Sequence, residues 1–204
     1  MVVLGLTGSI GMGKSTTASF FVEAGVPVLD SDAVVHALYE GEAVAPIEQA
    51  FPGTKFNGRI DRAELSRRVL GDPSAFRQLE AIVHPLVQKA QARFLAEAEG
   101  VGAKVAVLDI PLLFETGADR KVDAVVVVTA PKEIQRSRVT DRPGMTPAKL
   151  EALMQKQVPD AEKRRRADFI VDTSRGFDSA RAQVRAILEA VLAIRTETAR
   201  SGHA

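Results

Sequence analysis

The stretch "GSIGMGKS", residues 8–15, limits the possible folds of this chain more than any other part of it. It fits the pattern G-x-x-x-x-G-K-[ST] and lies directly between a short apolar run and a helical pattern. Glycines allow backbone conformations and close approaches that a Cβ would obstruct, so successive N–H groups can surround an anion at the N-terminus of the following helix. We therefore expect a strand, a phosphate-binding loop and a helix in direct succession.

The side chains of this loop predict how it binds a nucleotide. Lys14 supplies a positive charge to the outer phosphates, and the Ser15 hydroxyl is suited to be a Mg²⁺ ligand. The alternative, a glycine-rich turn without a nucleotide role, is disfavoured because the pattern is complete and lies in the right context. The residues that we expect to bind the nucleotide are Gly11, Met12, Gly13, Lys14, Ser15 and Thr16.

Length and composition narrow the class of protein. The chain has 204 residues, which suits one compact domain with a substantial core. It contains no cysteine, which excludes disulfides and thiolate chemistry. The N-terminus has no basic region typical of a signal peptide, and no stretch approaches the roughly 18 apolar residues of a membrane span. We expect a cytoplasmic protein without a membrane partner.

Five short apolar runs alternate with helical patterns, which is typical of a parallel α/β sheet. Several of these runs are apolar at consecutive positions, as strands buried on both faces are. The expected strands span residues 2–7, 26–30, 104–110, 123–130 and 167–172. The last helix is expected from about Asp178, with apolar residues from Val184 onward packed on the sheet.

The connections between these strands are unequal in length. A single helix ending near Gly25 joins the first two, whereas more than 70 residues separate the second strand from the third. Helix starts are predicted in this segment at Asp61 and at Asp72-Pro73, and a further helix from Pro85 to about Glu99. We interpret residues 33–103 as a helical insert that binds a substrate.

Residues 132–166 form a second excursion, which we interpret as a lid. It holds ten Lys or Arg against five Asp or Glu. This excess indicates a local anionic partner rather than a long nucleic acid, although a solvated helical face remains an alternative. Thr146-Pro147 predicts a helix start, and the run "KRRR" at 163–166 is expected to be an exposed basic turn.

Motifs that would indicate other phosphate-loop proteins are missing. A GTP-binding switch needs an N-K-x-D motif, but the only asparagine is Asn57, in "FNGR". The D-x-x-G pattern after the third strand and an "LSGGQ"-type transporter signature are missing too. The remaining class is a small kinase. In the predicted lid, Arg136, Arg138 and Arg142 follow a helical spacing, and a lid arginine can neutralise the charge on the transferring phosphoryl group.

Acidic residues follow two of the predicted strands. Asp30 and Asp32 end the second strand, where ligands lie in open parallel sheets. From position alone, two roles for Asp32 have equal weight. It could orient an acceptor hydroxyl and accept its proton, or it could cap the next helix. Asp30 is expected to be structural. Asp109, after the third strand, could contact the Mg²⁺ shell or simply end the strand.

Apolar and imidazole side chains near these positions are weaker signals. Pro111 and Leu112, with Leu113 and Phe114 after them, are expected to form a rigid wall beside a substrate. His36 and His84 are more often capping or packing residues than catalytic ones.

In combination, "GLTGSIGMGKST", "LDSDAVVH", "LEAIVHPLV", "LDIPLLFE", "QRSRVTDR" and "ADFIVDTS" resemble the dephospho-CoA kinase family over most of the chain. This resemblance implies a P-loop kinase fold, with a five-stranded parallel sheet flanked by helices, a helical CoA-binding insert and a lid. It also implies ATP as co-substrate, Mg²⁺, and transfer of the γ-phosphate to the ribose 3′-hydroxyl of dephospho-CoA.

The same resemblance assigns roles to individual residues. It places Asp32 at the acceptor hydroxyl, Lys14 and Ser15 at the ATP phosphates and Mg²⁺, and Arg138 and Arg142 in the lid. It also implies that His84 and its neighbours line the acceptor subdomain.

The resemblance is not complete, and other functions stay open. The family's D-A-D is D-S-D here, and its D-N after the last strand is "DTS", so we assign no adenine contact near Thr173. A kinase for another small acceptor, such as a nucleoside monophosphate, and a regulatory nucleotide-binding module without transfer chemistry are the alternatives. Neither nucleic acid nor an obligate protein partner is expected.

Overall fold

The computed structural model describes residues 1–201, with side chains to residue 194. The chain forms two compact units, each of which is described by itself. The first consists of Met1–Val28 and the chain from Ala98 onward, and the second of Leu29–Glu97.

A five-stranded sheet in the order β2-β5-β1-β6-β7 organises the first unit. The strands β1, β5, β6 and β7 pair in parallel, and β1 lies in the centre, with Leu6 opposite Asp109 of β5 and Val126 of β6. The five strands predicted from sequence are confirmed. They are β1 (Val2–Gly8), β2 (Val28–Asp30), β5 (Val105–Asp109), β6 (Ala124–Thr129) and β7 (Phe169–Asp172).

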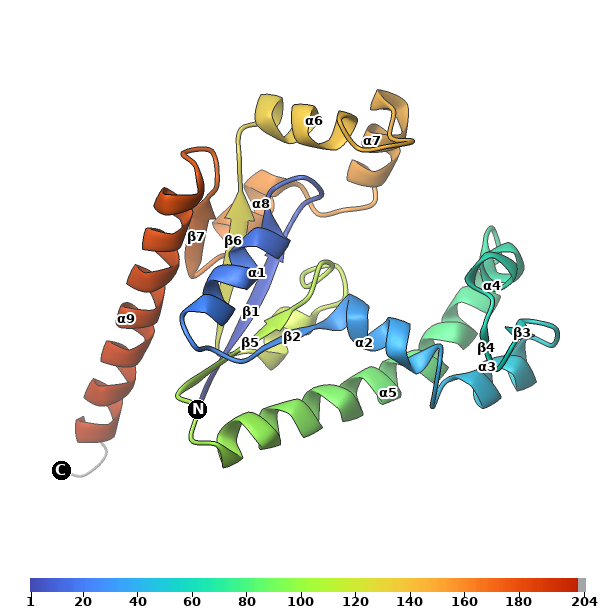
Figure 1. Ribbon diagram of the computed structural model, residues 1–204, viewed down its shortest axis with the longest axis horizontal. Coiled ribbons are helices and arrows are strands. Elements are labelled where there is room, and N and C mark those ends of the chain that lie inside the picture. The colour runs from blue at the N-terminus through green and yellow to red at the C-terminus, as the bar shows by residue number, and fades with distance from the viewer. Residues whose placement is uncertain (202–204) are drawn as a thin grey trace. The chain divides into compact units, whose positions relative to one another are not determined.

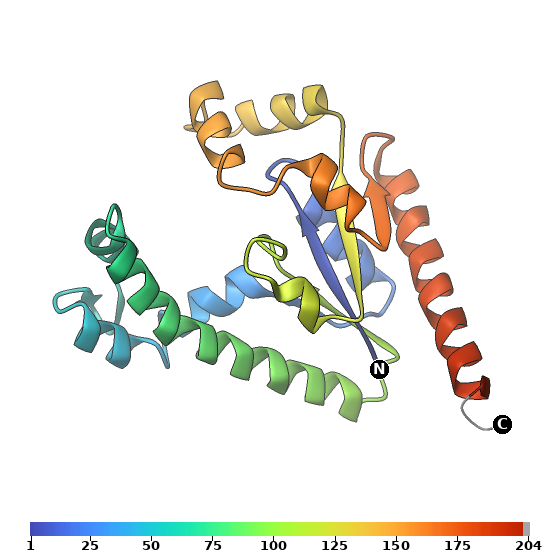
Figure 2. The ribbon, with the colours of Figure 1, turned by 180° about the vertical axis from the view of Figure 1, so that it is seen from behind.

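Helices cover both faces of this sheet (Figures 1 and 2). Two of them, α1 and α9, share a buried apolar cluster with one face. In the view from behind, α8 and the segment between β5 and β6 lie in front of the other face. The helices of this unit are α1 (Lys14–Glu23), η1 (Ala118–Lys121), α6 (Lys132–Thr140), α7 (Pro147–Met154), α8 (Asp160–Arg165) and α9 (Phe177–Ser201).

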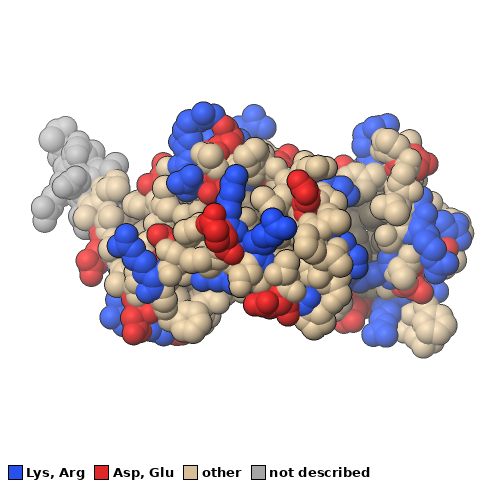
Figure 3. Space-filling model, turned by 90° about the horizontal axis from the view of Figure 1, so that it is seen from above, with Lys and Arg blue, Asp and Glu red and all other residues tan. Residues whose placement is uncertain are grey.

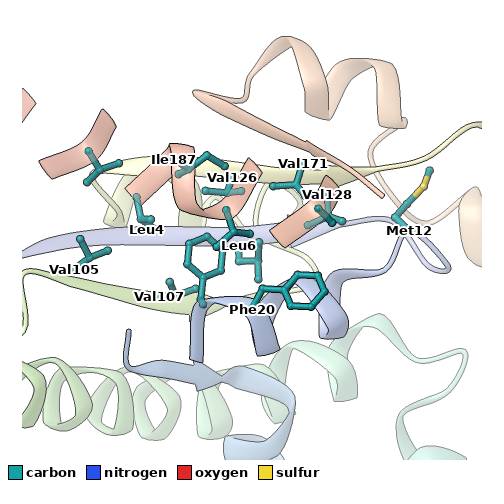
Figure 4. Packing of buried hydrophobic residues seen from close by; sticks show 14 of the residues in the cluster. Leu4, Leu6, Met12, Phe20, Val105, Val107, Val126, Val128, Val171 and Ile187 are labelled. Carbon is teal, nitrogen blue, oxygen red and sulfur yellow. The ribbon is translucent and has the colours of Figure 1, made fainter. Parts of the chain in front are cut away.

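The alternation of side chains along β6 explains why both faces are buried. Val126 and Val128 point into the cluster shared with α1 and α9, whereas Val125 and Val127 pack against Phe114 on the opposite face. Figure 4 shows the first cluster, in which side chains of β1, β5 and β6 meet Phe20 of α1 and Ile187 of α9. This continuous apolar packing holds the strand ends, and the loops that follow them, in fixed positions.

The second unit has a core of its own. Its elements are α2 (Ser31–Leu38), α3 (Val44–Ala50), the antiparallel pair β3 (Lys55–Phe56) and β4 (Arg59–Ile60), α4 (Arg62–Val69) and most of α5 (Pro73–Gly100). Ile47 is fully buried in this core. The two helix starts predicted here are confirmed, because Asp61 accepts from the backbone of Ala63 and Asp72 from the backbone of Ser74.

The prediction of a separate helix from Pro85 is wrong. α5 is one continuous helix with Pro85 in its interior. A proline there removes a backbone hydrogen bond and costs about 3 kcal/mol or more. Val83 before the proline and Leu86 after it pack into the same apolar cluster, so tertiary burial offsets that cost.

The β3–β4 hairpin was not predicted from the sequence. Its turn is Asn57-Gly58, and both residues have positive φ, 48° and 82°. Asn-Gly is the commonest sequence for a two-residue hairpin turn of this kind, so the dipeptide in "FNGR" was the signal that could have revealed it.

No helix within the described residues, 1–201, is long and apolar enough to span a membrane.

Candidate active site

The loop between β1 and α1 has the conformation that its glycines predict. Gly11 and Gly13 have φ of +79° and +91°. A Cβ on Gly8 would lie 2.7 Å from the backbone oxygen of Val128, so the loop leaves the sheet where only glycine fits. α1 begins at Lys14, directly after Gly13. The first N–H groups of this helix therefore face the loop, as an anion-binding site requires.

Lys14 is held by the end of the neighbouring strand. Its Nζ lies 2.5 Å from Oδ1 of Asp109, the last residue of β5. The Asp109 side chain is 3% exposed and that of Lys14 is 16% exposed. This buried pair fixes the ammonium group beside the loop, in place for an anionic ligand.

Arg138, on α6, contacts the loop through Thr173. Its guanidinium donates to Oγ1 and to the backbone oxygen of Thr173, at 2.8 and 2.9 Å. The Thr173 hydroxyl in turn donates to the backbone oxygen of Met12, at 2.8 Å. Thr173 thus connects α6 to the phosphate loop. The sequence analysis gave this residue no role, because a single sequence carries no signal for such a contact.

The other two lid arginines have different positions. Arg136 is exposed on α6, and Arg142 is exposed just after this helix ends at Thr140. The helical spacing predicted for all three arginines therefore holds for Arg136 and Arg138 but not for Arg142.

A cavity of about 820 Å³ lies beside the loop. It is bordered by Ser9 and Met12 of the loop and by α6, α7 and α8. Asp172 at the end of β7 also borders it, and a hydrogen bond from Ser174 holds the pKa of this carboxyl below its usual value. The volume lies in the usual range for small-molecule sites.

The prediction that residues 163–166 form an exposed basic turn is wrong for Lys163. This residue is completely buried on α8, with its Nζ 3.0 Å from Oε1 of Glu115. The three arginines that follow it are exposed, as predicted, although the first two belong to α8 rather than to a turn. Arg166 lies over the ring of Phe114, 4.2 Å from its centroid, and pairs with Asp119.

The other charges of residues 132–166 are also partly balanced. Arg164 pairs with Asp160, and Arg165 pairs with Glu162, both within the segment. On the face seen in Figure 3, several blue and red side chains are neighbours on a mostly tan surface. The basic excess of the segment is reduced further by Lys163 and Arg166, whose acidic partners lie outside it.

In the second unit, Asp30 and Asp32 have separate roles. Oδ1 of Asp30 accepts from the backbone N–H groups of Asp32 and Ala33, at 2.8 and 3.2 Å, so Asp30 is the N-cap of α2. The alternative in which Asp32 caps this helix is wrong. Asp32 is exposed in the first turn, and its side chain does not cap the helix.

A pocket of about 450 Å³ lies within the second unit. It is lined by His36, Tyr39, Glu40, Phe56, Arg59, Ile60, Asp61, Arg62 and Ala63. Arg62 lies 3.4 Å from Nδ1 of His36, and burial raises the pKa of Tyr39. His84, in contrast, is exposed on α5, 3.9 Å from Glu80.

The segment after β5 is only partly the substrate wall that was expected. Leu113 and Phe114 are buried in the core on the back of the sheet, so they cannot line a substrate site. Leu112 is 42% exposed, and the backbone oxygen of Pro111 accepts from the hydroxyl of Thr7 at 3.0 Å.

Within residues 1–194, whose side chains the structure describes, no three His, Asp or Glu side chains lie together so that they could hold a metal ion.

The parallel sheet, the glycine loop and the Lys14–Asp109 pair define a P-loop kinase. A shikimate kinase from Acinetobacter baumannii has a similar fold, with a TM-score of 0.54 and 19% identity over 95% of this chain and 94% of that one. A second solved structure, TT1252 from Thermus thermophilus, superimposes with a TM-score of 0.81 and 36% identity over 94% and 96%.

Sequence comparison gives the family. The family model described as dephospho-CoA kinase matches residues 2–179. A dephospho-CoA kinase from Rhodopseudomonas palustris is 62% identical over 93% of this chain and 96% of its own length. The chain belongs to the dephospho-CoA kinase family.

Proposed function

We propose that this protein transfers the γ-phosphoryl group of ATP to the ribose 3′-hydroxyl of dephospho-CoA, giving coenzyme A and ADP. The observation that carries the proposal is the match to dephospho-CoA kinases over nearly the whole chain, in a fold whose phosphate loop is complete. The alternatives, a nucleoside monophosphate kinase and a regulatory module, lack such support.

On the donor side, residues Gly11 to Thr16 bind the phosphates of ATP. The loop and the first turn of α1 supply N–H groups, and Lys14 supplies the charge. Because Lys14 is already held by Asp109, little ordering is needed when ATP binds. Arg138, docked on Thr173, and Arg142 would neutralise charge on the transferring group.

The residues around the loop also fit Mg²⁺. Ser15 presents an exposed hydroxyl in the first turn of α1, and Asp109 ends the adjacent strand with a carboxylate. Mg²⁺ prefers oxygen ligands and is often bound by one or two protein groups together with phosphates and water. We propose that Ser15 and Asp109 hold the ion, which would neutralise charge on the ATP phosphates.

On the acceptor side, Asp32 is the proposed general base. Its carboxylate takes the proton of the 3′-hydroxyl as the hydroxyl oxygen forms a bond to the γ-phosphorus. The bond between this phosphorus and the β,γ-bridging oxygen breaks, and ADP leaves with the bridging oxygen. The exposure of Asp32 and the capping role of Asp30 support this assignment.

The pocket of the second unit is the proposed place for dephospho-CoA. Tyr39 and Phe56 offer aromatic surface, and Arg59 and Arg62 offer positive charge, which together suit an acceptor with a base and a pyrophosphate. This supports residues 33–103 as the CoA-binding insert, and residues 132–166 stay a predicted lid. Roles for His84, Pro111 and Leu112 in substrate binding, and a cytoplasmic location, stay predictions.

The test is an assay of the purified protein with ATP, Mg²⁺ and dephospho-CoA. We expect ADP release that depends on dephospho-CoA, and a product whose mass increases by one phosphoryl group and whose 3′-phosphate a 3′-nucleotidase removes. Rapid turnover of nucleoside monophosphates without turnover of dephospho-CoA would overturn the proposal. ATP binding without any acceptor-dependent ADP would indicate the regulatory module instead.

A further inference from the structure

Both peptide groups of Ile10, in the middle of the phosphate loop, are bound by side chains from distant parts of the chain. The side-chain amide of Gln135 on α6 donates to the backbone oxygen of Ile10, at 2.7 Å and across 125 residues. The side-chain oxygen of Gln157 accepts from the backbone N–H of Ile10, at 3.4 Å. At these distances the bond of Gln135 is the stronger of the two.

Gln135 belongs to a face of α6 that packs directly on the loop. It is 2% exposed, and Val139, one turn further on, is fully buried. A Cβ on Gly11 would lie 2.4 Å from Cγ2 of Val139 and 3.1 Å from the backbone oxygen of Gln135. The loop and the helix are therefore in van der Waals contact at Gly11, the residue after Ile10.

The Gln135 bond fixes the peptide plane that joins Ile10 to Gly11. A phosphate loop works only if its N–H groups point at the anion, and glycine at position 11 leaves this plane free to rotate. A carbonyl oxygen that is bonded to α6 cannot turn toward a bound phosphate, which it would repel. The amide of Gln135 thus holds a donor-rich loop in its binding conformation before ATP arrives.

We propose that Gln135 is a positioning residue for phosphoryl transfer, acting through Ile10 on the phosphate loop. Its side-chain amide is engaged by the backbone oxygen of Ile10, so its proposed effect is exerted through the loop. The inference rests on the proposed function, in which this loop binds the phosphates of ATP.

The first experiment replaces Gln135 with leucine, which keeps most of the volume and removes the donor. We expect kcat/KM for ATP to fall about 10- to 100-fold, since small misplacements of phosphate-binding groups cost that much. KM for dephospho-CoA should not change. Gln88→Leu is the matched control, because Gln88 is an exposed glutamine on α5 that lines neither of the two pockets and should keep wild-type kinetics.

A second variant separates positioning from folding. In Gln135→Glu the side chain keeps its shape but can donate to the Ile10 oxygen only when it is protonated. We expect the ratio of variant to wild-type kcat/KM to rise as the pH is lowered from 8 to 5.5, while the urea midpoints of both proteins are followed at each pH. A purely structural glutamine would give a constant ratio.

The outcomes are distinct. Gln135→Leu with a wild-type urea midpoint and ATP kinetics within twofold of wild type would overturn the proposal. So would a flat activity ratio for Gln135→Glu, even if the leucine variant does not fold. The ATP affinity of the same variants, measured by calorimetry, tests the role of Gln135 in the loop without any acceptor. The proposal for Gln135 can therefore fail or hold even if dephospho-CoA is not the acceptor.

Discussion

Two aspartates, Asp30 and Asp32, lie two positions apart and differ in what their carboxylates can do. Asp30 bonds two N–H groups at the start of α2, so its charge is already engaged by the helix. Asp32 lies inside the first turn and is exposed. An exposed carboxylate that does not cap the helix and lies just after a strand of the sheet is available for chemistry.

We expect Asp32→Asn to lower turnover by about 10²- to 10⁴-fold, because asparagine keeps the shape but cannot accept the proton. ATP affinity should hardly change. ADP release and calorimetric titration with ATP measure the two effects.

Asp30→Ala is the matched control for this substitution. It removes the cap of α2 and should lower the free energy of unfolding by about 1 kcal/mol, read from a urea midpoint. If Asp32→Asn reduced ATP affinity as much as turnover, Asp32 would have a role in folding or general binding.

Among the helices, α8 shows how a short element is held in place by charge. It has six residues, too few for stability on its own. Its Lys163 is buried against Glu115, which also accepts from the backbone N–H of Val158 at 2.8 Å. The pair therefore joins α8 to the segment that follows β5.

Lys163→Ala should lower the free energy of unfolding by about 3–5 kcal/mol, because it leaves the Glu115 carboxylate buried without its cation. Urea denaturation measures the change. Arg165→Ala is the control on the same helix: its side chain is 75% exposed, so we expect a change within about 0.5 kcal/mol.

The double variant Lys163→Met with Glu115→Gln should recover most of this loss, since it buries no charge and keeps an amide oxygen that can accept from the Val158 N–H. A loss below about 1 kcal/mol in the single variant would show that the pair contributes little.

The chain is divided into two units, each with buried hydrophobic residues of its own. The phosphate loop and the Lys14–Asp109 pair belong to the first unit, and the 450 Å³ pocket belongs to the second. Each core is built from its own cluster of buried residues. A substitution in the core of one unit should therefore change either the affinity for ATP or the turnover of dephospho-CoA, but not both to the same extent.

Ile47→Ala tests this separation, since Ile47 is fully buried in the second unit. We expect the second unit to lose about 2–5 kcal/mol of stability, with faster hydrogen exchange confined to residues 29–97. Turnover of dephospho-CoA should fall, while calorimetric ATP affinity should stay near that of the wild type.

Leu6→Ala, at a fully buried position of β1, is the matched substitution in the first unit and should affect ATP binding. If Ile47→Ala weakened ATP binding as strongly as Leu6→Ala does, the two cores would not be separable.

Sequence reasoning identified those parts of the fold that depend on neighbours along the chain. The phosphate loop, the five strands and the helix caps at Asp61 and Asp72 follow from glycine conformations, apolar runs and side-chain capping. It was wrong at Pro85 and at Lys163. Burial in an apolar cluster overrode the local preference at Pro85, and a buried ion pair with Glu115 did so at Lys163.

The tertiary structure alone decided which distant residues meet at the loop. Lys14 reaches Asp109 across 95 residues, Gln135 reaches Ile10 across 125, and Thr173 reaches Met12 across 161. Such contacts depend on which faces of α6 and of the sheet pack together, and a local pattern contains no information on that choice. The sequence was therefore sufficient to predict a chain that binds phosphate, but the packing of α6 on the loop determines how that phosphate site is held.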